Sequence, residues 1–142
     1  MKRVIISYII CLLLLLAITS PITAHIGHEM EGEGKVVKGV EGRLKVTPAM
    51  GSIDFYLYDA KRDKAITDAK VVVTITMPDG KKVEKDLPGT KTEETFSFMN
   101  TVDLSSKGIY SLDIVAKVQY KIGFKTYHSV KTVTFSFTYE VK

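Results

Sequence analysis

The chain of 142 residues contains one cysteine, four prolines and no tryptophan. The cysteine, Cys11, lies inside an apolar run near the amino terminus. A disulfide within the chain is therefore excluded, and the folded part has no thiolate to act as a nucleophile or metal ligand. No segment shows the apolar period of an amphipathic helix with capping residues. Stability must therefore come from a packed core that is built without disulfides and without evident helices.

Signatures of catalysis are also missing. The chain has three histidines, and it lacks a Gly-x-Ser-x-Gly elbow, a phosphate-binding loop, a dinucleotide fingerprint and a calcium loop. Its aspartates fall mainly in or beside turns, where this residue bonds to local backbone, although paired carboxylates depend on three-dimensional spacing. We expect a protein that is not an enzyme. The formal net charge of +4 includes Lys2 and Arg3, and the mixed charges elsewhere do not predict a nucleic-acid partner.

The amino-terminal segment has the layout of a secretory signal peptide. Lys2 and Arg3 precede the apolar residues 4–18, and Ala24 is a suitable small residue before a cut. We expect residues 1–24 to be removed and the protein to be exported to the periplasm or the extracellular space. The alternative is an uncleaved membrane anchor over residues 4–24, which is long enough to span a bilayer.

A cut after Ala24 makes His25 the new amino terminus, with His28 and Met30 close behind it. The free amine and the imidazole of His25 both lose their protons near neutral pH, so together they can chelate a metal ion. Imidazole and amine suit oxidised copper, nickel or zinc, whereas the thioether of Met30 prefers reduced copper. The predicted metal ligands are therefore His25, His28 and Met30, with copper as the metal. The alternative is a polar arm whose two histidines occur by chance.

Residues 25–42 are rich in glycine and glutamate, which predicts a flexible arm, and the ordered domain is expected over residues 43–142. In that domain apolar and polar residues alternate with the period of β-strands. Residues 71–77 are uncharged on both faces, as in a central strand, whereas the lysine-rich residues 81–87 suit an edge strand. Met77 and Met99 are expected to fill the core, Met50 to end a strand, and His128 to lie at a surface or edge. The seven expected strands cover residues 44–48, 53–58, 71–77, 81–87, 96–104, 110–120 and 132–141.

Seven short strands without an intervening helix predict an all-β fold, an antiparallel immunoglobulin-like β-sandwich of Greek-key type. Tyr110 follows the turn at residues 103–109, a pattern typical of a tyrosine corner, in which the phenol bonds back to the preceding connection. The alternative is an ordinary core tyrosine. Residues 120–130 are interpreted as a hairpin loop or a bulged strand, because Gly123 interrupts the alternation.

Two resemblances follow from these segments. Residues 65–80, AITDAKVVVTITMPDG, and residues 107–114, KGIYSLDI, make the chain similar to exported immunoglobulin-like domains of the YtkA/FixH type. That resemblance implies a sandwich over residues 44–141 and an association with copper handling or cytochrome oxidase assembly. The chain also resembles CopC-type periplasmic copper proteins, whose mature amino-terminal histidine binds copper. Only His25 matches, because the internal Asp-x-His of that family is absent: His128 follows Thr126 and Tyr127.

These observations predict an exported binding module that holds or delivers copper through His25, His28 and Met30. The alternative function is a structural or accessory domain of a cell-envelope complex that contacts a protein partner through sheet edges or loops.

Overall fold

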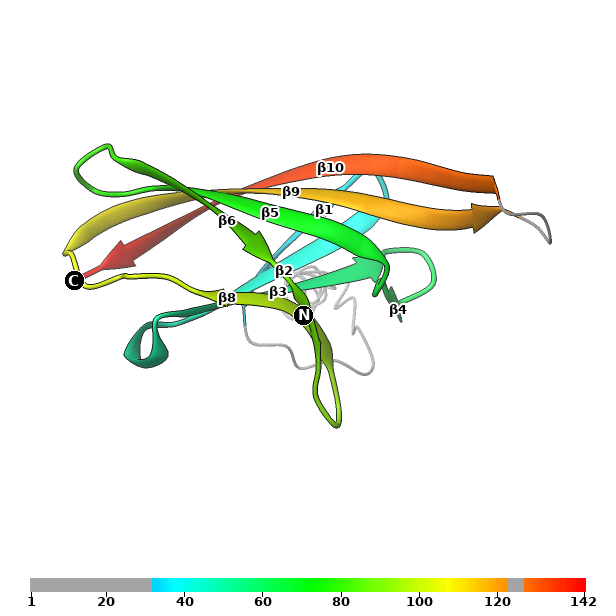
Figure 1. The fold of residues 1–142 in the computed structure, drawn as a ribbon, viewed down its shortest axis with the longest axis horizontal. Helices are drawn as coiled ribbons and strands as arrows, with labels where there is room; N and C mark the ends of the chain where they lie inside the picture. Colours follow the sequence, from blue (N-terminus) through cyan, green and yellow to red (C-terminus); the bar gives the residue numbers. More distant parts are fainter. Residues whose placement is uncertain (1–31, 123–126) are drawn as a thin grey trace, which may run out of the picture.

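The computed structural model describes residues 32–122 and 127–142, which form two facing antiparallel β-sheets (Figure 1). The larger sheet has the order β1-β2-β3-β8-β7, with β4 paired to β3, and the smaller sheet has the order β10-β9-β5-β6. A 3-10 turn, η1 (Pro48–Met50), joins β2 to β3. The strands are β1 (Glu33–Val37), β2 (Val40–Thr47), β3 (Ser52–Asp59), β4 (Lys64–Ala65), β5 (Ala69–Thr76), β6 (Lys82–Leu87), β7 (Gly89–Lys91), β8 (Phe96–Thr101), β9 (Gly108–Ile122) and β10 (Tyr127–Val141).

This architecture is the predicted immunoglobulin-like β-sandwich. The uncharged residues 71–77 lie mostly in β5, which pairs with β9 on one side and β6 on the other, as expected for a central strand. The lysine-rich β6 is an edge strand, also as expected. In the described ranges, no helix is long and apolar enough to cross a membrane.

The core lies between the sheets and is built from the inward residues of each alternating strand. The Phe55 ring of the larger sheet meets Phe135 edge-on, with centroids 5.4 Å apart, and Phe137 at 6.3 Å. These contacts join strands that are distant in the sequence, so they fix how the two sheets face each other. The other large buried apolar side chains include Val40, Ile53, Leu57, Val73, Ile75, Leu87, Phe98, Leu112 and Ile114.

The predicted flexible arm over residues 25–42 is wrong for its second half. Residues 33–37 form β1, and Val40 begins β2 as a fully buried core residue. The turn between them has Lys38 at φ 51° and Gly39 at φ 78°, and positive φ at both central residues is the geometry of a two-residue hairpin turn. Glycine in this segment therefore serves a tight turn. The ordered domain begins ahead of the predicted residue 43, and residues 25–31 lie outside the described part.

The tyrosine corner is confirmed. Tyr110 is fully buried, and its hydroxyl donates a hydrogen bond of 2.7 Å to the carbonyl oxygen of Ser106. The bond ties the connection between β8 and β9 to the start of β9, so it fixes where the chain crosses from one sheet to the other.

Replacing Tyr110 with phenylalanine should lower the free energy of unfolding by about 1 kcal/mol, because one hydrogen bond is lost while the ring still fills the core. Urea unfolding measures the change. Tyr139→Phe is the matched control, because among the described residues the half-buried Tyr139 hydroxyl has no hydrogen-bond partner. Equal losses in the two variants would contradict a stabilising role for the corner.

Strands β9 and β10 form a hairpin of constant register, from Gly108 opposite Val141 to Ile122 opposite Tyr127. The described part of residues 120–130 is therefore regular strand without a bulge, and residues 123–126 lie outside the described part. The shift in apolar pattern at Val130 has a simple cause, since this side chain is on the outer face of the sheet and is 57% exposed.

Candidate functional site

The predicted metal ligands His25, His28 and Met30 lie outside the described residues. The described chain starts at Gly32, immediately before β1 at the edge of the larger sheet. A Cβ atom at position 32 would lie 2.5 Å from the carbonyl oxygen of Leu44, and the φ of Gly32 is 139°. Only glycine fits this close approach, and the contact with Leu44 locates where the amino-terminal segment joins the sandwich.

Level with Gly32, a row of paired residues crosses the larger sheet and places a carboxylate beside a thioether. Lys45 in β2 is opposite Asp54 in β3, and Asp54 is opposite Met99 in β8. The neighbouring residues Phe55 and Phe98 point into the core, so alternation turns Asp54 and Met99 to the outer face of the larger sheet. Directly opposed side chains in antiparallel strands have Cβ atoms about 4.5–5.5 Å apart. Asp54 and Met99 are therefore neighbours on this face.

The core role predicted for Met99 is therefore wrong. Its side chain is half-buried on the outer face, because Phe96 and Phe98 of the same strand take the inward positions. The alternation around Phe98 was the signal that could have shown this. Met77 packs against the core as expected, and Met50 lies in the turn after β2 with 74% of its surface exposed.

On the outer face Asp54 lies between Lys45 of β2 and Met99 of β8. Its carboxylate accepts a hydrogen bond of 3.3 Å from the hydroxyl of Ser52. The pKa of Tyr56, two residues away, is raised first by burial and then by the negative charge of Asp54. The Asp54 carboxylate therefore adds a negative charge near Tyr56, and Lys45 on the neighbouring strand adds a positive charge beside it.

The described residues do not hold a complete metal site of the common hard or borderline type. In the part of the chain that the structure describes, no group of three or more histidine, cysteine, aspartate or glutamate side chains is arranged to hold a metal ion. Asp54 and Met99 would supply two donors, and further ligands would have to come from elsewhere. His128 belongs to β10, opposite Lys121, and thus to the other sheet.

A groove of about 520 Å³ opens at the end of the sandwich where the β3–β4 turn, the β4–β5 connection and β9 meet. The Asp59 carboxylate at its rim accepts hydrogen bonds from the backbone amides of Lys61 and Arg62, at 3.0 and 3.1 Å. The pKa of Tyr120 is raised by burial and then by Asp59. Asp59 stabilises its turn, as expected for aspartates beside turns. Its lining residues are Asp59, Arg62, Lys64, Ala65, Ile66, Thr67, Asp68, Val118, Gln119 and Tyr120.

The structure is an immunoglobulin-like β-sandwich. Its larger sheet carries the Asp54 carboxylate and the Met99 thioether side by side on the outer face, and these two residues are called the outer-face pair. Solved structures share this fold. FetP from uropathogenic Escherichia coli strain F11, isolated after expression in the periplasm, matches with a TM-score of 0.57 and 12% identity over 77% of this chain and 93% of its own. The copper-reconstituted P19 protein from Campylobacter jejuni matches with a TM-score of 0.61 and 8% identity over 77% and 92%. A copper-bound variant of FetP matches with a TM-score of 0.56 and 13% identity over 76% and 94%.

At these identities the similarity shows the fold alone. No family model and no curated protein matches the chain. The β-sandwich implied by the YtkA/FixH and CopC resemblances is therefore present, while membership of either family stays a prediction.

Proposed function

We propose that this protein is an exported binding module that holds or passes copper through its mature amino-terminal segment, His25, His28 and Met30. The observation that carries the proposal is the position of Gly32 beside the row that ends in Asp54 and Met99. The copper-bound and copper-reconstituted proteins that share the fold support the choice of metal.

The amino-terminal ligands are within covalent reach of the outer-face pair. Met99 lies three strands from β1, and neighbouring strands are about 4.8 Å apart, which gives about 14 Å. An extended chain spans about 3.3–3.6 Å per residue, so His28, four residues before Gly32, reaches this distance, and His25 reaches further. The attachment point therefore allows the segment and the outer face to serve one ion.

The combined donors fit copper better than a harder metal. Amine and imidazole bind oxidised copper, and the thioethers of Met30 and Met99 bind reduced copper. The carboxylate of Asp54, which has Lys45 opposite it on β2, is a further oxygen donor on this face. When bound, copper would supply a metal centre with two accessible oxidation states, and the residues of this chain would hold it and set which state is preferred.

Copper titration of the exported protein tests the proposal, with intact mass to show whether His25 is the first residue. Met99→Leu conserves side-chain volume, so it should keep the fold while weakening binding of reduced copper by roughly tenfold or more in competition with a chromophoric chelator. Met77→Leu is the control, because Met77 packs against the core and should not affect binding.

If the protein binds no copper in either oxidation state, the proposed function is wrong. If copper binds and Met99→Leu behaves like Met77→Leu, the outer face has no part in the site. Co-purification with a membrane complex in the absence of bound copper would instead favour an accessory role in the cell envelope.

A further inference from the structure

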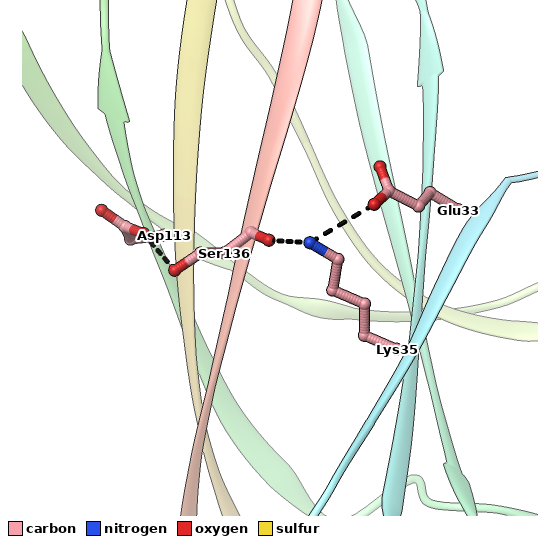
Figure 2. Close-up of polar contacts among 4 residues, drawn as sticks. All are labelled: Glu33, Lys35, Asp113 and Ser136. Atoms are coloured by element: carbon pink, nitrogen blue, oxygen red, sulfur yellow. Dashed lines mark hydrogen bonds and ion pairs between the residues drawn. The ribbon is translucent and has the colours of Figure 1, made fainter.

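Among the residues that the structure describes, no strand pairs with the outer edge of β10, and some of its backbone groups have no hydrogen-bond partner. β10 is the outer strand of the smaller sheet and has 15 residues. The carbonyl of Ser136 points away from β9, since it accepts a hydrogen bond from Lys35 of β1 (Figure 2). The amide of Gln119, opposite Val130, likewise bonds away from β10, to the carbonyl of Asp68. Both bonds show that the even-numbered residues of β10 direct their amides and carbonyls outward.

Three consecutive outward positions, Val130, Thr132 and Thr134, are not capped. Within residues 32–122 and 127–142, no hydrogen-bond partner meets the outward amides and carbonyls of these three residues. All three are β-branched and uncharged, which favours strand pairing. Lys131 does not block strand pairing at this edge, because its ammonium group donates a hydrogen bond of 2.9 Å to the carbonyl of Lys38, towards the other sheet.

The remaining edges are short or protected. β7 has three residues and β1 has five. On β6, the side-chain amide of Asn100 donates to the carbonyl of Asp86 at 2.8 Å, and the strand carries charged side chains. Proteins commonly block edge strands in these ways, so an uncapped, uncharged stretch on the longest edge is the exception that calls for a partner.

We propose that a second copy of this chain pairs with β10 in antiparallel orientation, with Thr132 on the two-fold axis. In this register Thr132 lies opposite the Thr132 of the other copy, and Val130 lies opposite Thr134. The outward amides and carbonyls of the two copies then face each other, and no two side chains of like charge lie opposite each other. The pairing joins the two smaller sheets, each of four strands, into one sheet across the axis.

The neighbouring registers are less favourable. An axis at Lys131 places the two Lys131 side chains directly opposite each other, and like charges in this position are destabilising. An axis at Thr134 brings Ser136 into the interface, where Lys35 occupies its carbonyl. The Lys35 ammonium also lies 3.3 Å from the Glu33 carboxylate, and this ion pair holds it at the boundary of the free stretch (Figure 2).

The test uses the exported protein with a chelator present, so that its result is independent of copper. Sedimentation equilibrium should show a dimer. Because Thr132 faces itself across the axis, Thr132→Lys alone and Thr132→Glu alone should each weaken dimerisation by about tenfold or more, whereas a mixture of the two should form a heterodimer. Thr138→Lys and Thr138→Glu are the controls, since Thr138 has the same outward parity beyond Ser136 and lies outside the paired stretch.

Thr132→Pro gives a second test that does not depend on charge. The amide at position 132 points outward, so proline removes no hydrogen bond to β9 and is tolerated at an edge. It should abolish the dimer while circular dichroism stays unchanged. A monomer at every accessible concentration overturns the proposal. A dimer that tolerates all the Thr132 variants, or in which the charged mixture fails to pair, overturns it equally.

Discussion

Replacing His25 with alanine should weaken binding of oxidised copper by roughly 100-fold or more. Loss of a residue that only hydrogen-bonds to a metal ligand already lowers metal affinity by about 10–100-fold, and this change removes the ligand itself. The α-amine remains in the variant, so the loss reports on the imidazole alone. Isothermal titration of the exported protein measures it. His128→Ala is the control, because His128 lies in β10 of the smaller sheet, away from the point where the amino-terminal segment joins.

The pH dependence of binding separates this site from nonspecific binding. The amine has an ordinary pKa of about 7.7–8.0 and imidazole of about 6.5, and both must lose a proton before they bind. Affinity should therefore fall as the pH drops below about 8 and fall more steeply below about 6.5. In the His25→Ala variant one imidazole fewer has to lose a proton, so its affinity should fall less steeply below about pH 6.5. An unchanged affinity and pH profile in the variant, or a protein that retains residues 1–24, would remove the assignment of this ligand.

Much of the sandwich could be predicted because its strands follow a strict alternation. In residues 71–77 and 132–141 every second side chain is apolar, and these side chains are buried in the core or packed against it. The corner at Tyr110 was also recognisable, since a turn that ends in glycine before a tyrosine has a specific hydrogen-bonding geometry. In these cases local patterns coincide with the demands of the final fold.

β1 and the start of β2 were missed because composition does not show which segments pair. Glycine and glutamate in residues 33–42 favour a flexible chain, but burial of Val40 and pairing of β1 with β2 outweigh that preference. Such pairing depends on partners that a local window does not contain.

The outer-face pair could not be predicted from the sequence, for the same reason. Asp54 and Met99 are far apart in the sequence, and only the pairing of β3 with β8 makes them neighbours. Alternation around Phe98 could have shown the side on which Met99 lies, but it could not have shown what lies opposite. The candidate site therefore combines a segment chosen from its residue types with a surface that only the fold defines.

Replacing Gly42 with valine should lower the free energy of unfolding by about 3 kcal/mol, at the upper end of the usual cost of overpacking. Gly42 faces the core between the two sheets. A Cβ atom there would lie 2.6 Å from Cζ of Phe55 and 2.9 Å from Cε1 of Phe135. These rings also contact each other edge-on, so neither can move without disturbing the packing between the sheets.

Urea unfolding of Gly42→Ala and Gly42→Val measures the cost, which should increase with side-chain size. Gly34→Ala is the control, because a Cβ atom at Gly34 would meet only Arg43 and Glu41 side-chain atoms, at 3.4 Å or more. A smaller side chain at position 135 should relieve the clash, so Phe135→Leu combined with Gly42→Ala should cost less than the sum of the single changes. Strict additivity would show that glycine at position 42 serves the backbone of β2, and that the Phe55 and Phe135 rings do not require it.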